Sequence, residues 1–187
     1  MGWRGAECSE TSAHPGVAAA IGIIVAAGLA ITGWRFIGPD HLVYAFVVQG
    51  GFTFLGLLTG PLFVDTARRR YTVTSAEPRI YALLGADALR RLLGRIGWNS
   101  IIGSLREQGE GHTRLSRLLR GTELSETGHT IAGGATLLLA AAAIGTAHFV
   151  GATQIMLVGV LLHGYPIMIQ RIVRQRLRHP QKLMTDD

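Results

Sequence analysis

Four long apolar stretches, separated by polar connections, dominate the pattern of the sequence. Each has about the 20 residues that an α-helix needs to cross the hydrocarbon core of a bilayer. The sequence therefore predicts an all-α integral membrane protein, a four-helix bundle with a multi-pass topology. The expected spans are Val17–Phe36, His41–Val64, Thr130–Phe149 and Gly151–Gln170.

The segment between the second and third spans carries most of the positive charge, with eleven arginines in residues 65–128. Because cytoplasmic loops are enriched in Lys and Arg, we place this segment and both chain termini in the cytoplasm, and the protein in the cell membrane. Within it, Ile80–Trp98 and Leu115–Leu124 interleave leucines with arginines. This predicts amphipathic interfacial helices between spans 2 and 3, lying on the inner leaflet. A small soluble cap packed under the bundle is the open alternative.

The composition agrees with a lipid environment. Only 16% of the residues are charged, whereas soluble domains carry about 25%. A net charge of +6 would also suit nucleic acid, but the arginines flank apolar spans, so we expect no nucleic-acid partner. We expect the bilayer and a hydrophobic small-molecule substrate as partners. The single cysteine, Cys8, excludes a disulfide framework.

These features divide the chain into five segments. A polar N-terminal segment precedes the first two spans, an interfacial segment separates them from the last two, and a basic tail follows. The sequence does not determine the oligomeric state. The expected bounds are 1–16, 17–64, 65–128, 129–171 and 172–187.

The fourth span combines a histidine, a proline and arginines in one helix. His163 lies in its apolar part, and an ionisable side chain at membrane depth is a candidate functional residue. Helical periodicity places Gln170, Arg171 and Arg174 on the same face as His163, where this polar column could line a crevice open to the inner leaflet. As alternatives, the arginines only anchor the helix to lipid phosphates, and His163 only bonds another helix.

Glu126 and His129, three residues apart at the expected start of the third span, form a second candidate group. This spacing puts them on one helical face, and a carboxylate beside an imidazole fixes its tautomer and raises its basicity. The alternative is an ordinary carboxylate at a helix start. Glu126, His129 and His163 could also supply three metal ligands. Because no spacing brings the third ligand near the other two, we expect neither a metal nor a cofactor.

These motifs resemble those of a known bacterial membrane family, the glycosyl-4,4'-diaponeurosporenoate acyltransferases of staphyloxanthin biosynthesis. The family has an asparagine at the position of His163 and a second one at the position of Val173. The residues that carry the resemblance are Glu126-Thr-Gly-His129, then His163-Gly-Tyr165-Pro166 with Gln170-Arg171 and Arg174, and Trp98-Asn99 in the polar middle region.

The resemblance implies a membrane acyltransferase with an acyl donor as a possible partner. In this interpretation His129, oriented by Glu126, is the general base, and Arg171 with Gln170 stabilises an oxyanion or holds the donor. Because the family's asparagine is replaced inside the crevice, a cyclase, isomerase or epoxide-opening enzyme of secondary metabolism is the alternative. A non-enzymatic lipid-binding or assembly protein is a second one. The expected substrate-binding residues are His163, Tyr165, Gln170, Arg174, Trp98 and Asn99.

Overall fold

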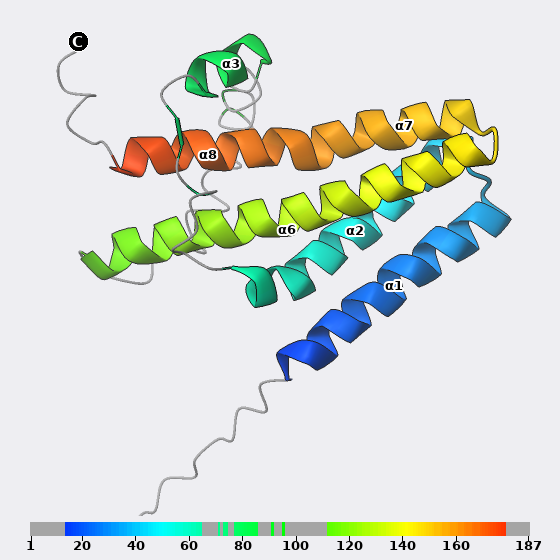
Figure 1. Cartoon of the computed structure of the whole chain (residues 1–187), viewed down its shortest axis with the longest axis horizontal. Coiled ribbons are helices and arrows are strands. Elements are labelled where there is room, and N and C mark those ends of the chain that lie inside the picture. The colour runs from blue at the N-terminus through cyan, green and yellow to red at the C-terminus, as the bar shows by residue number, and fades with distance from the viewer. Residues whose placement is uncertain are drawn as a thin grey trace, which may run out of the picture.

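Long helices lie side by side in the computed structural model (Figure 1). The first hairpin consists of α1 (Pro15–Phe36) and α2 (Leu42–Phe63). The second pairs α6 (His112–Gly145) with an almost continuous helix made of α7 (Phe149–Gly159), the π-helical turn η2 (Val160–Gly164) and α8 (Tyr165–Arg178). The turns of both hairpins lie at the same end of the bundle, on the right in Figure 1.

A short helix, α3 (Glu77–Leu83), lies beside α8 toward the opposite end. Every regular element among the described residues is helical. Most of the expected interfacial helix Ile80–Trp98 lies outside the described residues. The structure describes residues 14–64, 71, 73–74, 77–85, 91, 95 and 112–178.

Four helical stretches are long and apolar enough to cross a membrane, which confirms the predicted four-helix membrane bundle. The first two agree with the expected spans to within two residues. They are Pro15–Phe36, Leu42–Phe63, Leu118–Gly145 and Phe149–Gln175.

The third and fourth spans extend further than the sequence indicated. The third begins at Leu118 and not at Thr130, and α6 itself begins at His112. Leu115–Leu124, expected as a separate surface helix, is therefore part of α6. The helix continues through this polar stretch because its hydroxyl groups bond to the helix backbone, as Thr127 does with the carbonyl of Glu123 at 2.8 Å.

Small residues allow α2 and α6 to approach closely. Gly56 on α2 faces Gly128 on α6, and a Cβ built on Gly128 would lie 3.0 Å from the carbonyl oxygen of Gly56. A Cβ built on Gly56 would collide with the carbonyl of Gly128. Close backbone contact of this kind is the usual way in which helices gain packing energy inside lipid.

The hairpin turns are joined by an ion pair at the far end of the bundle. Asp40 accepts a hydrogen bond from the backbone N–H of Gly151 at 2.8 Å and lies 2.7 Å from Nδ1 of His148. The hydrogen bond with His148 lowers the pKa of Asp40, with a further contribution from Gly151. His148, expected to be solvated, is half-buried and packs edge-on against Trp34.

We predict that Gly56→Ala destabilises the bundle, because the added methyl group meets the backbone of α6. Overpacking of this kind costs about 1–3 kcal/mol. Gly50→Ala on the same helix is the matched control, since a Cβ there has no neighbour within 4 Å. Thermal unfolding in detergent should show a lower midpoint for Gly56→Ala only, and equal midpoints would contradict the close contact.

Candidate functional site

The π-helical turn in the fourth span positions His163. In this turn the N–H of Tyr165 donates to the carbonyl of Val160, five residues earlier. The wider turn accommodates Pro166, whose ring would otherwise meet the carbonyl of Leu162. The side chain of His163 is 1% exposed and points into the bundle. Single π turns inside α-helices occur frequently at functional sites.

A buried glutamine connects His163 to the rest of the bundle. Gln49 on α2 is 0% exposed, and its Nε2 donates to the carbonyl of Ile155 at 2.9 Å. Because a carbonyl can only accept, this bond fixes the orientation of the amide. Its Oε1 therefore faces the hydroxyl of Thr136 at 2.9 Å and Nε2 of His163 at 2.8 Å.

This arrangement determines the tautomers of two neighbouring histidines. Because Oε1 of Gln49 accepts, Nε2 of His163 carries a hydrogen, and a neutral His163 then has a bare Nδ1. That atom lies 3.2 Å from Nδ1 of His129, which must donate. A neutral His129 therefore keeps its lone pair on Nε2. This nitrogen makes no hydrogen bond among the described residues.

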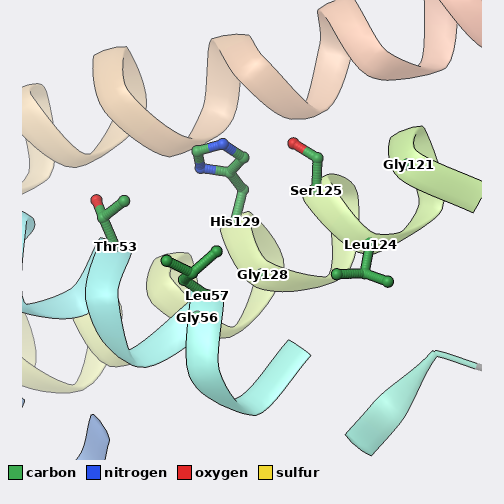
Figure 2. Close-up of a pocket in the computed structure, with 8 residues that line it drawn as sticks. All are labelled: Thr53, Gly56, Leu57, Gly121, Leu124, Ser125, Gly128 and His129. Carbon is green, nitrogen blue, oxygen red and sulfur yellow. The ribbon is translucent and has the colours of Figure 1, made fainter. Parts of the chain in front are cut away.

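His129 lines a pocket of about 330 Å³ between α2 and α6 (Figure 2). The walls consist mainly of glycine and leucine, and none of the lining residues carries a formal charge at neutral pH. The pocket lies within the apolar stretches of both helices. Its lining residues are Thr53, Gly56 and Leu57 on α2 and Gly121, Leu124, Ser125, Gly128 and His129 on α6.

Ser125 is a second polar group at the His129 end of the pocket. It lies one helical turn before His129, and Figure 2 shows both side chains pointing to the same side of α6. Nε2 of Gln170 donates to Oγ of Ser125 at 3.2 Å. Ser125 thus accepts from Gln170, and its own hydroxyl hydrogen is available for a group in the pocket.

Arg171 bridges two carboxylates from different helices. Its Nε and Nη2 donate to Glu77 of α3 at 2.7 and 3.0 Å, and its Nη1 donates to Glu126 of α6 at 2.9 Å. The bond to Arg171 lowers the pKa of Glu77 to about 2, although partial burial opposes the shift. The bidentate geometry on Glu77 is the arrangement for which a guanidinium is best suited. Arg171 therefore holds α3 against the bundle.

Arg174 is fully buried, at 0% exposed. Its Nε donates to Thr122 at 3.2 Å, and its guanidinium lies 5.2 Å from the ring centre of Tyr71. Its Nη1 lies 2.7 Å from Oε2 of Glu126. The N–H groups do not point at that oxygen, so the contact is an ion pair without a hydrogen bond. Arg174 is therefore an internal charge partner, neither a lipid anchor nor a residue that a substrate reaches.

The structure corrects the expected pairing of Glu126 with His129. The carboxylate of Glu126 faces Arg171 and Arg174, and the hydrogen bond of the His129 ring goes to His163. Although both residues lie on neighbouring positions of α6, full positive charges from α8 attract the carboxylate more strongly than a neutral ring does. The helix-start alternative for Glu126 is also wrong, because α6 begins at His112.

The remaining predicted residues fall into two groups. The column on α8 faces α6 as expected, through Gln170, Arg171 and Arg174. Tyr165, expected to bind substrate, instead donates to the carbonyl of Leu84 at 3.0 Å. Trp98 and Asn99 lie outside the described residues. The described residues include no group of three or more side chains that could hold a metal.

Sequence reasoning missed four residues of the site: Gln49 as the partner of His163, Thr136, Ser125 and Glu77. Gln49 was visible as a polar residue inside an apolar span, but its partners come from distant parts of the sequence. Ser125 gave no signal, because a serine near a helix end is common. Its spacing of four residues from His129 becomes informative only once the pocket is known.

We predict that Arg171→Lys destabilises the protein, because one ammonium group cannot bridge Glu77 and Glu126 together. Hydrogen bonds to charged groups contribute about 1.5–3 kcal/mol each, so the loss should be of that size. Arg35→Lys, at an exposed position of α1, is the matched control. Equal unfolding midpoints of the two variants in detergent would argue against the bridge.

We also predict a dependence of stability on acid pH. Because the pKa of Glu77 is about 2 in the folded protein and 4.5 ordinarily, its ionised form stabilises the fold fully above pH 4.5. That contribution is lost as the pH falls from 4.5 toward 2. Glu77→Gln should make the unfolding midpoint change less steeply over this range. A slope identical to that of the unchanged protein would exclude Glu77 as a source.

Comparison with known proteins agrees with the geometry. A family model described as glycosyl-4,4'-diaponeurosporenoate acyltransferase matches residues 67–181, which is more than half of the chain. The match includes α6, η2 and α8, and leaves out α1 and α2. No curated protein and no solved structure matches the chain significantly. The chain therefore belongs to the glycosyl-4,4'-diaponeurosporenoate acyltransferase family and is an acyltransferase-like membrane enzyme.

Proposed function

We propose that this protein transfers an acyl group to a hydroxyl of a lipid or isoprenoid-type acceptor, with His129 as the general base. The observation that carries the proposal is the 3.2 Å hydrogen bond between the Nδ1 atoms of His129 and His163. It leaves Nε2 of His129 as a free base in a residue that lines a pocket. Family membership supports the reaction class.

The reaction follows from this arrangement in two steps. Nε2 of His129 takes the proton of the acceptor hydroxyl as its oxygen forms a bond to the carbonyl carbon of an activated ester or thioester. The resulting tetrahedral oxyanion then collapses and breaks the bond to the leaving group of the donor. The imidazolium of His129 returns the proton to that leaving group. Products are the acylated acceptor and the free alcohol or thiol.

Ser125 is the group best placed to stabilise the oxyanion. Its hydroxyl lines the pocket one turn from His129, and Gln170 fixes its oxygen at 3.2 Å. A preorganised donor in a site without water stabilises developing charge more than the same donor would in water. We assign this role to Ser125 in place of Arg171, since the Nε, Nη1 and Nη2 atoms of Arg171 already donate to carboxylates.

His163 and Gln49 act as positioning residues. Neither has a free polar atom toward the pocket, because His163 bonds His129 and Gln49 while Gln49 bonds Ile155. Together they hold the ring of His129 in one tautomer. An asparagine at position 163, as the resemblance describes for the family, could accept the same hydrogen bond through its side-chain oxygen.

We place the reaction at the inner face of the cell membrane, with both termini in the cytoplasm. The pocket lies toward the end of the bundle where the second span leads into residues 65–128. That segment and the tail hold most of the arginines of the chain, and arginine-rich loops remain on the cytoplasmic side. An acyl donor can thus come from the cytoplasm, while the hydrophobic acceptor comes from the bilayer.

We predict that His129→Ala lowers the rate of ester formation by about 10²–10⁴, the usual contribution of a general base. His163→Asn should retain most of the activity, because asparagine still accepts from Nδ1 of His129. His163→Leu should lose it. Esterification of a glycosylated isoprenoid by membranes that contain each variant is the measurement.

His148→Ala is the matched control for these variants, since His148 lies at the other end of the bundle. Full activity of His129→Ala in correctly inserted protein would exclude the proposed base. Equal activity of His163→Asn and His163→Leu would exclude the proposed positioning of the ring.

A further inference from the structure

The pocket continues past its two polar groups toward a glycine. Gly121, Ser125 and His129 follow one another at intervals of four residues, so they form a row along one side of α6. A Cβ built on Gly121 has no neighbour within 4 Å. The row therefore has its base and hydroxyl at one end and open space at the other.

The remaining lining offers no free polar side chain to a ligand. The hydroxyl of Thr53 donates to the backbone carbonyl of Gln49 at 2.8 Å, and Leu57 and Leu124 contribute only apolar surface. A sugar in this part of the pocket would leave its hydroxyl groups without partners, at a cost of about 1–3 kcal/mol for each. An alkyl chain has no such groups and gains by leaving water.

We propose that this pocket binds the alkyl chain of the acyl group, with its carbonyl at His129 and Ser125 and its chain running past Leu124 toward Gly121. The inference rests on the proposed function, which takes His129 as the reacting end. It adds the class of group that the pocket takes and names Gly121 as the residue that limits chain length.

The size of the pocket agrees with a single chain. The eight residues from His129 to Gly121 extend about 12 Å along a helix. If an alkyl chain advances about 1.2 Å per bond, as an extended peptide backbone does, this is the reach of about ten carbon atoms. A volume of about 330 Å³ lies at the lower end of the range of about 300–1,000 Å³ for small-molecule sites.

The chain can enter from the side of the bundle. Leu57, on the α2 wall of the pocket, is 64% exposed among the described residues, and it belongs to the apolar surface that α2 presents to lipid. Figure 2 shows Leu57 and Leu124 on opposite sides of the pocket, on α2 and α6. A chain dissolved in the bilayer can therefore slide between them without passing through water.

Photo-crosslinking tests this inference without any need for turnover. The full-length protein in lipid nanodiscs is irradiated with a palmitic acid that carries a diazirine at about its tenth carbon, the reach estimated above. We expect labelling of α6 near Gly121 and Leu124. Gly121→Leu should reduce it several-fold, and a competing saturated fatty acid should suppress it in the unchanged protein.

Gly134→Leu is the matched control, because Gly134 also lies on α6 with no neighbour within 4 Å of a Cβ and does not line the pocket. Both leucines suit a helix better than glycine does. Gly121→Ala serves as a second, smaller change and should give an intermediate reduction. Equal labelling of the two leucine variants, or labelling spread over α1 as for simple partition into lipid, would overturn the inference.

The result is independent of the proposed chemistry. If labelling behaves as expected while His129→Ala keeps full activity, the alkyl site stands and the assigned base is wrong. If His129→Ala is inactive while Gly121→Leu is labelled normally, the base stands and the chain lies elsewhere.

Discussion

Everything at the centre of this bundle depends on the need of buried polar groups to find partners inside the protein, because lipid offers none. Gln49 meets this need for three elements together, since it bonds the backbone of α7, the hydroxyl of Thr136 on α6 and the ring of His163 in η2. These bonds orient His163, and His163 orients His129. One amide thereby both joins the helices and prepares a base at the edge of a pocket.

The site combines parts of the chain that differ in their relation to the family. The bases and the ion-pair network come from residues 67–181, which match the family. The first hairpin lies outside that match, yet α2 provides Gln49 and one wall of the pocket. The close approach of Gly56 to Gly128 sets how far apart those walls stand. The first two spans are thus part of the candidate site as well as a membrane anchor.

The charged residues beside the pocket hold elements together. Glu126 receives both Arg171 and Arg174, and Arg171 reaches on to Glu77 of α3. Such pairs are favourable in a low-dielectric interior only when each charge has its partner in place. This network fixes α3 and α8 relative to α6. It leaves the neutral groups, His129 and Ser125, to face the pocket.

Apolar length and helical period were enough to determine four spans, their antiparallel order and the face of α8 that meets α6. They also singled out His129 and His163, since an ionisable group in an apolar stretch is rarely without purpose. The partners were decided by tertiary structure. Spacing along one helix places Glu126 near His129, but the register between helices brings two guanidinium groups to that carboxylate and a second imidazole to that ring. This register depends on contacts such as Gly56 with Gly128, between residues far apart in the sequence, which periodicity within one segment does not encode.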